Sequence, residues 1–138
     1  MNSLKLALSN LMAIQKAKQE KLLAKSQLSM PSTNEINTNV VNGEWDRVDF
    51  AVDTLNHIME EVVELRQELP RKWWKNEPEK RQKLLVVGSE ERSRALAEFA
   101  DIVIHLVNFA IYLGVSPKEL TEAIMGKIDY NSKRPDQN

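Results

Sequence analysis

The sequence predicts an all-α protein, a helical bundle of about four to five helices. Strand signals are nearly absent from the 138 residues, and apolar side chains recur at helical spacing instead. Gly, Pro and capping residues separate these stretches into segments joined by short connections. Such segments bury their apolar stripes by packing helix on helix. A chain of this length is expected to form a single domain, because domains hold roughly 100–200 residues.

The first half of the chain is expected to hold two long helices. Residues 1–25 contain the first, in which Leu4, Leu8 and Leu11 share one face. Residues 26–43 read as a polar linker rich in Ser, Thr and Asn, and residues 44–138 as the helical core. The second helix is expected from about Asp46 to Leu69, where Pro70 follows.

The second half is expected to hold a short helix and two longer ones. The short helix covers residues 78–87, and a long apolar helix covers residues 89–113, with Gly114 positioned to end it. Ser116 and Glu119, with a proline between them, form a capping box that starts the last helix. That helix stops before Pro135 and directs three apolar side chains inward, namely Leu120, Ile124 and Ile128.

Composition excludes several classes of protein. The chain has 42% hydrophobic and 28% charged residues and a net charge of −1, so no nucleic-acid partner is expected. The absence of Cys excludes a disulfide framework, a thiolate zinc site and a cysteine nucleophile, and it fits a cytoplasmic location. The four Gly residues are too widely spaced for the common phosphate-binding loops. The longest apolar stretch, residues 102–113, is too short to cross a bilayer, so no membrane partner is expected.

Acidic side chains concentrate on one face of the second helix. Between Asp49 and Leu69 the chain has six acids and one base, Arg66. Like charges three or four residues apart on a helix repel by roughly 0.2–0.5 kcal/mol for each pair. An uncompensated stripe of this kind favours a bound divalent cation, with a solvated acidic face as the alternative.

The long helix at residues 89–113 carries a narrow polar seam. Glu98, Asp101, His105 and Asn108 lie on one side of it, and nearly every other position from Phe99 onward is apolar. A helix with so wide an apolar surface is expected to be buried on most sides, where carboxylates must be paired or coordinated. A functional seam is favoured over the alternative, a buried salt bridge to Arg92, Arg94 or the first helix.

The two helices together predict a metal site built from carboxylate oxygens. Such ligands suit Mg²⁺, Mn²⁺ or Ca²⁺. Because Mg²⁺ usually binds few carboxylates together with substrate phosphates, a cluster of four or five acids suggests more than one ion and a phosphorylated ligand. The acids of this cluster are Glu60, Glu61, Glu64, Glu98 and Asp101.

These acids resemble the signature of a known superfamily. Glu60, Glu61 and Glu64, followed by Glu98 and Asp101, are similar to the EExxE…ExxD pattern of the all-α nucleoside triphosphate pyrophosphohydrolases. Its members include MazG-like proteins, dimeric dUTPases and phage dCTPase-dUTPases. Three further stretches agree: residues 64–75 with their WWK segment, residues 127–134 with the K..YN..R tail of MazG-like proteins, and residues 11–15 with the first helix of dimeric dUTPases.

The resemblance implies Mg²⁺-dependent hydrolysis of a (d)NTP to the monophosphate and pyrophosphate, as in control of the nucleotide pool, with Mn²⁺ able to substitute. It implies dUTP or dCTP as substrate, and a purine dNTP such as dGTP remains open. The implied metal ligands are Glu61, Glu64, Glu98 and Asp101, with Glu60, Glu61 or Glu64 as the catalytic base. The implied phosphate contacts are Lys127, Asn131, Arg134 and Lys75. The implied contacts to base or sugar are Gln15, Asn108, Tyr130, Trp73 and Trp74, and the alternative for the two Trp residues is that they seal the dimer core.

A homo-oligomer, either a dimer or a tetramer, is also expected. The apolar surface of residues 89–113 needs more covering than four other helices of one chain provide, and a second copy would supply it. The alternative to an enzyme is a non-enzymatic helical interaction module, in which the basic first helix binds a partner.

Overall fold

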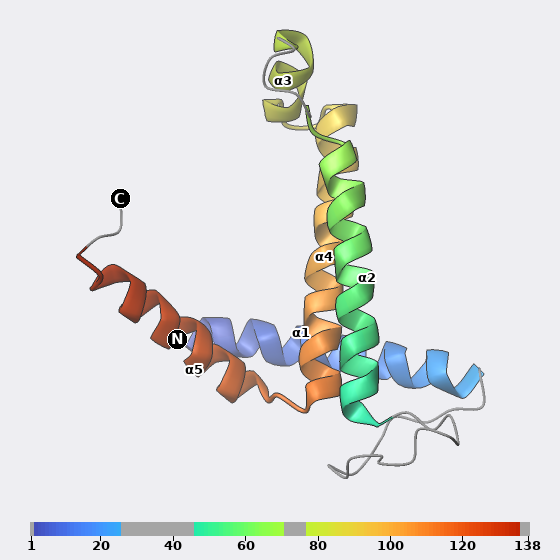
Figure 1. Cartoon of the computed structure of the whole chain (residues 1–138), viewed down its shortest axis with the longest axis vertical. Coiled ribbons are helices and arrows are strands. Elements are labelled where there is room, and N and C mark those ends of the chain that lie inside the picture. The colour runs from blue at the N-terminus through green and yellow to red at the C-terminus, as the bar shows by residue number, and fades with distance from the viewer. Residues whose placement is uncertain (1, 26–45, 71–76, 136–138) are drawn as a thin grey trace. The chain divides into compact units, whose positions relative to one another are not determined.

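The computed structural model describes residues 2–25, 46–70 and 77–135, and within these ranges the chain is helical with no strand. The five helices are α1 (Asn2–Lys25), α2 (Arg47–Gln67), α3 (Pro78–Leu85), α4 (Glu90–Leu113) and α5 (Pro117–Ser132) (Figure 1). The all-α class is therefore confirmed. The expected ends of the first four helices differ from the observed ends by two residues at most.

The chain divides into two compact units. The first consists of residues 1–51 and 107–138, and the second of residues 52–106. Helices α2 and α4 each contribute to both units, whereas α1 and α5 belong to the first and α3 to the second. The expected organisation as an N-terminal helix, a linker and one core stays a prediction.

The first unit is built around a small apolar core. Met12 from α1 packs with Val107, Ala110 and Ile111 from α4, and three half-buried residues extend this cluster, namely Leu11, Val115 and Leu120. Helix α1 also packs against α5. The ring of Tyr112 stacks on Phe50 with centroids 5.1 Å apart, and its hydroxyl donates to Gln19 Oε1 at 2.6 Å. These contacts tie α1, the start of α2 and the end of α4 together.

In the second unit α2 and α4 run antiparallel. Glu68 near the end of α2 pairs with Arg94 near the start of α4 at 3.3 Å, and Glu61 lies 3.9 Å from His105 farther along. Arg92 donates to the backbone carbonyl of Leu84 at 2.9 Å and so ties α4 to α3. This antiparallel pair positions the polar seam predicted from the sequence.

At the α4–α5 junction, the residues predicted to end one helix and to start the next do so. Gly114 has φ +76°, and the N–H groups of Gly114 and Val115 donate to the carbonyls of Ile111 and Ala110, the pattern of a Schellman motif. Ser116 then accepts a hydrogen bond from the Glu119 N–H at 3.1 Å and caps α5. Both helix boundaries expected here are confirmed.

The expected burial of α4 is wrong for a single chain. Its buried residues are Val107, Asn108, Ala110, Ile111 and Tyr112, all near its C-terminal end. Leu96, Phe99 and Leu106 each remain about half exposed, because the described helices leave this side of α4 uncovered. Ile128 of α5, expected to point inward, is also exposed. By length and composition alone α4 is apolar enough to cross a membrane, which is weak evidence because core helices of soluble proteins pass the same test.

Candidate metal centre

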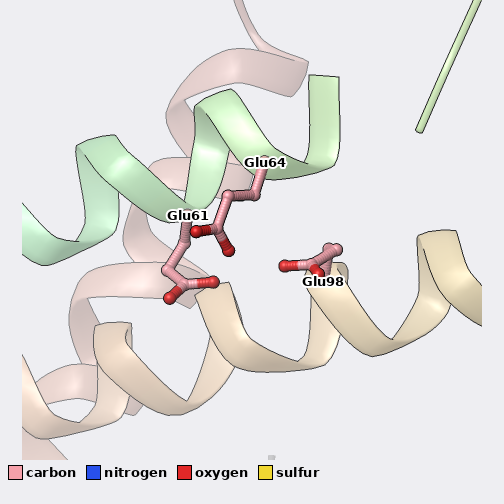
Figure 2. Close-up of side chains that lie close together, drawn as sticks. All are labelled: Glu61, Glu64 and Glu98. Carbon is pink, nitrogen blue, oxygen red and sulfur yellow. The ribbon is translucent and has the colours of Figure 1, made fainter. Parts of the chain in front are cut away.

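Three carboxylates converge where α2 faces α4. Glu61 and Glu64 lie one turn apart on α2, because residues three apart share a helix face, and Glu98 reaches them from α4 (Figure 2). One oxygen of each side chain lies within 4.8 Å of the others. Three oxygens at this spacing are a donor set of the kind that hard divalent cations use.

Two oxygens of this cluster are buried without a partner. Glu61 Oε2 and Glu98 Oε2 are shielded from solvent and accept no hydrogen bond, while the Glu64 side chain is exposed at the edge of the cluster. A polar atom that is shielded from solvent without a partner destabilises the folded state, and more so when it is charged. The cluster therefore has two oxygens without a partner on its inner side that can bind a cation, and it is accessible to solvent on its outer side, at Glu64.

Electrostatics in the cluster favour protonation or an added cation. Burial raises the pKa of Glu61, and the negative charges of Glu64 and Asp101 raise it further. Burial also raises the pKa of Glu98, followed by its interactions with Glu64, Glu61 and Asp101. Asp101 is itself exposed, but its charge acts on the two partly buried carboxylates, Glu61 and Glu98. A bound divalent cation would remove this mutual repulsion.

The buried salt bridge that was the alternative for the seam is not formed by the expected arginines. Arg94 pairs with Glu68 at 3.3 Å and with Glu90 at 3.5 Å, and Arg92 binds a backbone carbonyl. Within the described ranges no Lys or Arg pairs with Glu61, Glu64, Glu98 or Asp101. The positive charge that the cluster lacks is thus not supplied by these parts of the chain.

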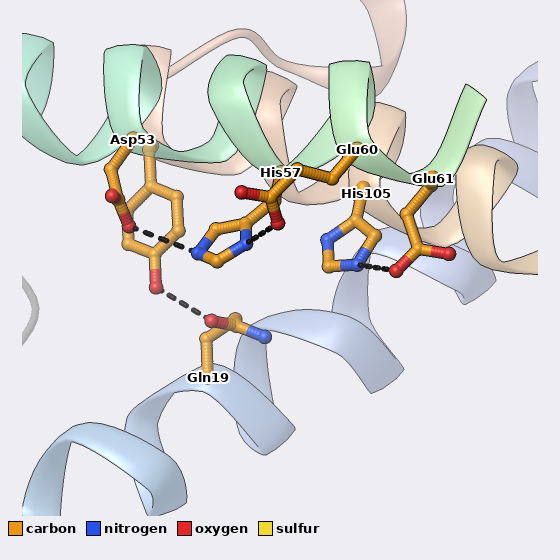
Figure 3. Close-up of polar contacts among 7 residues, drawn as sticks. Gln19, Asp53, His57, Glu60, Glu61 and His105 are labelled. Atoms are coloured by element: carbon orange, nitrogen blue, oxygen red, sulfur yellow. Dashed lines mark hydrogen bonds and ion pairs between the residues drawn. The ribbon is translucent and has the colours of Figure 1, made fainter. Parts of the chain in front are cut away.

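Two histidines lie beside the cluster (Figure 3). His57 sits between Asp53 and Glu60 at 3.5 Å from each, and its ring stacks on that of His105 with centroids 6.0 Å apart. His105 Nε2 approaches Glu61 Oε1 at 3.9 Å. The polar seam predicted from the sequence includes His105, and its position one turn after Asp101 indicates proximity to the carboxylates.

The idea of a wholly uncompensated stripe on α2 is therefore wrong. Arg94 of α4 pairs with Glu68, a cation that the sequence of α2 alone does not show, and His57 of α2 lies between Asp53 and Glu60. Glu60, one of the expected acids, is directed at His57, and its side chain is mostly exposed. Glu68 is thus the acid of this stripe that pairs with an arginine, and within the described ranges the other acids of α2 have no Lys or Arg partner.

The other expected site residues that the structure describes belong to the first unit. Lys127 Nζ lies 4.9 Å from the centre of the Tyr130 ring, and the Arg134 guanidinium lies 6.0 Å from it, so two of the expected phosphate contacts gather around one aromatic ring of α5. Asn131, on the same helix, is partly buried.

Gln15 and Asn108, the residues expected to read the base, are both buried in the first unit, at 5% and 4% exposure. Asn108 Oδ1 is buried without a hydrogen-bond partner. A buried amide with a free acceptor can bind a donor on a ligand. Trp73, Trp74 and Lys75 lie outside the described residues.

Comparison with known proteins adds no relative. No protein-family model, no curated protein and no solved structure matches this chain.

Proposed function

We propose that the chain is a Mg²⁺-dependent nucleoside triphosphate pyrophosphohydrolase of the all-α, MazG-like superfamily. The observation that carries this proposal is the convergence of Glu61, Glu64 and Glu98, two of which have a buried oxygen without a partner. The sequence resemblance names this same set of acids as metal ligands. The reaction would convert a deoxynucleoside triphosphate to its monophosphate and pyrophosphate.

The chemistry of the donor set fits Mg²⁺. All donors are carboxylate oxygens, which suit Mg²⁺ or Mn²⁺ better than softer metals. Glu61, Glu64 and Glu98 would hold the cation, with Asp101 as a fourth ligand or as the ligand of a second ion. Glu60 is assigned no ligand role because it contacts His57 instead. An ion bound here would neutralise triphosphate oxygens and lower the pKa of a water molecule.

The residues of the chain would perform the remaining tasks. A carboxylate oxygen of Glu61 or Glu64 accepts a proton as water attacks the α-phosphorus. The new bond joins the water oxygen to the α-phosphorus, and the bond from the α-phosphorus to the bridging oxygen breaks, so that pyrophosphate leaves with that oxygen. Most of the acceleration in such reactions comes from positioning and charge stabilisation.

Lys127 and Arg134 are the proposed contacts to the phosphates of the leaving group. Their arrangement around Tyr130 supports this assignment, because a shared ring holds two cations near each other. Asn108 and Gln15 are the proposed contacts to the base, and dUTP and dCTP are the proposed substrates. Trp73, Trp74 and Lys75 keep the roles that the resemblance implies.

The test is release of pyrophosphate from a panel of dNTPs with Mg²⁺ or with EDTA. We expect activity with at least one pyrimidine dNTP that EDTA abolishes. Loss of a group that only orients a metal ligand reduces activity 10–100-fold, so Glu64→Gln and Asp101→Asn should each reduce kcat at least about 100-fold. The matched control is Glu90→Gln, an acid on α4 that pairs with Arg94 and should leave kcat unchanged.

The alternative function, a non-enzymatic interaction module, is favoured by one observation. Helices α2 and α4 expose seven large apolar side chains in the second unit, 37–62% exposed: Leu55, Met59, Val62, Leu96, Phe99, Val103 and Leu106. Exposed apolar surfaces of this kind mark interaction sites. We call this set the apolar face. If no dNTP yields pyrophosphate with Mg²⁺ or Mn²⁺, the module becomes the better assignment.

The apolar face also supports the proposed homo-oligomer. Its residues recur at three- and four-residue spacing on each helix. Leu96 and Phe99 of this face also line a mainly apolar groove of about 500 Å³, together with Leu65, Leu69 and residues of α3. The same face on a second copy matches it in length and chemistry, as a two-fold interface requires. We propose a dimer through this face, which two dimers can extend to a tetramer.

A further inference from the structure

Both histidines of the chain lie at one place in the second unit, beside the carboxylate cluster. The sequence has two His residues, and the centroids of their rings are 6.0 Å apart, with a 16° angle between the ring planes. His57 comes from α2 and His105 from α4. Zn²⁺ is bound in proteins by Cys, His, Asp and Glu. Because the chain has no Cys, these two imidazoles are its only Zn²⁺ ligands besides carboxylates.

Each imidazole has a carboxylate at its outer nitrogen (Figure 3). Asp53 Oδ2 lies 3.5 Å from His57 Nε2, and Glu61 Oε1 lies 3.9 Å from His105 Nε2. A histidine that binds a metal almost always donates its other N–H group to a carboxylate, a carbonyl or water, and this contact fixes the ring and its tautomer. The two acids therefore favour a proton on each Nε2 atom and leave each Nδ1 atom as an electron-pair donor.

A third donor lies at the inner side of the two rings. Glu60 Oε2 is 3.5 Å from His57 Nδ1, and Figure 3 shows the second nitrogen of His105 on the side toward His57. Two atoms that bind one Zn²⁺ ion at about 2.0–2.1 Å lie about 3.0–3.5 Å from each other. An N–H···O hydrogen bond joins atoms that are about 2.7–3.2 Å apart. The spacing of His57 and Glu60 therefore fits two ligands of one ion better than a direct hydrogen bond.

This group of donors is open and would close around an ion. Among the described residues, the ligand atoms that already lie within 4.8 Å of one another are those of the carboxylate cluster, so the histidine donors are more widely spaced. The side chains of His57 and Glu60 are 54% and 73% exposed, so their rotation toward His105 displaces solvent rather than packed atoms. Within the described ranges no Lys or Arg pairs with Asp53 or Glu60 and competes with a metal for them.

We propose that His57, His105 and Glu60 bind one transition-metal ion of the Zn²⁺ class. Asp53 and Glu61 hold the two imidazoles in place. Imidazole nitrogen suits Zn²⁺, Co²⁺ or Ni²⁺, whereas Mg²⁺ prefers oxygen ligands, so this position differs in chemistry from the proposed Mg²⁺ site. A bound ion would join α2 to α4 at this point. The assignment does not depend on the proposed enzyme activity, because two of the three acids of the carboxylate cluster take no part in it.

Proton NMR of the untagged full chain tests the proposal directly, because every imidazole signal of the protein comes from one of these two histidines. Zn²⁺ is titrated with millimolar Mg²⁺ present to compete for the all-oxygen cluster. We expect the Hε1 signals of both histidines to shift together and to reach a limit at one Zn²⁺ ion per chain, and Mg²⁺ alone to shift them far less. A shift of only one histidine, or of neither, would overturn the proposal.

Variants locate the ion by calorimetric titration with Zn²⁺ in the same buffer. Loss of a group that only orients a metal ligand lowers metal affinity roughly 10–100-fold, so His57→Gln and His105→Gln should each weaken binding at least about tenfold. Glu64→Gln, on the same helix as His57, is the matched control and should retain the affinity. Unchanged affinity in either histidine variant, or an equal loss in Glu64→Gln, would contradict the assignment. Pyrophosphate release with Mg²⁺ is measured separately, so failure of one assignment does not decide the other.

Discussion

Glu61 and Glu98 destabilise the folded state when no cation is bound. Each is an acid whose pKa is raised in the folded state, first by burial and then by neighbouring acids. The folded state therefore binds these protons more tightly than the unfolded state does. Their contribution is most favourable below the ordinary value of 4.5 and is lost as the pH rises through the raised pKa values.

The pH dependence of stability should reveal this effect. With EDTA present, Glu98→Gln should gain stability relative to the unaltered protein as the pH rises above 4.5, because the amide carries no charge to repel Glu61 and Glu64. The measurement is the urea midpoint of both proteins between pH 4.5 and neutrality.

Saturating Mg²⁺ serves as the second arm of that experiment. It should stabilise the unaltered protein at neutral pH and have a much smaller effect on Glu98→Gln, because ligand binding to the folded state alone raises its stability. A marked loss of stability in Glu98→Gln without metal would instead mean that the Glu98 charge is paired in the folded protein.

Asn108, a proposed contact to the base, also has a polar atom without a partner, and its effect on stability can be measured. Its Oδ1 is buried and accepts no hydrogen bond, so Asn108→Leu should leave the nucleotide-free protein as stable or stabilise it by about 1 kcal/mol. If Asn108 binds the base, the same change should raise the KM of the preferred dNTP at least about tenfold.

Thr121→Val is the matched control, because the buried Thr121 hydroxyl does have a partner, the Pro117 carbonyl at 2.6 Å. It should lower the free energy of unfolding by about 1 kcal/mol. Urea denaturation measures both variants. A comparable destabilisation by Asn108→Leu would indicate that the amide is structurally satisfied and would count against a ligand role.

Among the elements, α5 depends most clearly on a local signal. Ser116 caps it, Pro117 occupies its first position, and Gly114 ends the preceding helix with φ +76°. The cap satisfies an N–H group that has no partner inside the helix. Because α5 packs against α1, its stability also supports the core of the first unit.

Removal of this cap should have a measurable effect. Ser116→Ala should lower the free energy of unfolding by about 1 kcal/mol, the usual value for loss of an N-cap. Ser93→Ala, an exposed position inside α4, should change it by less than about 0.5 kcal/mol. Equal effects of the two changes in urea denaturation would show that the Ser116 hydrogen bond contributes nothing.

At the scale of the whole molecule, the main feature is how much apolar surface a single chain leaves uncovered. The seven residues of the apolar face lie on the same two helices that hold the carboxylates. Helices α2 and α4 face each other through the polar seam, so their apolar stripes point away from that contact. A second copy at this face would bury those stripes and fix the helices that carry the site.

Light scattering coupled to size exclusion should therefore give a mass of at least about twice the 15.8 kDa of one chain at low micromolar concentration. Phe99→Asp, at the centre of the apolar face, should shift the mass toward that of one chain. Gln82→Asp, an exposed polar position on α3, should leave it unchanged. A folded and active protein at the mass of one chain would contradict the proposed dimer.

The sequence by itself determined the helices and their ends. Helix-ending residues such as Pro70 and Gly114 act within a few residues of themselves, so the boundaries follow from local steric and hydrogen-bond rules. It also determined that Glu61 and Glu64 share a face, and that Glu98 and Asp101 share another, because helical spacing fixes neighbours on one helix. The grouping of these acids across two helices followed from two acidic faces that each lacked a counter-charge and from a pattern resemblance, because spacing along one helix does not bring them together.

Only the tertiary structure decided which faces meet. Apolar periodicity predicts that the stripe with Leu55 and Met59 turns inward, yet these side chains are exposed while Glu61 lies in the seam. Periodicity specifies the direction of a face but not its partner, and that partner can lie on another helix or on another chain. The pairing of Arg94 with Glu68 likewise depends on residues far apart in the sequence, which no local rule brings together.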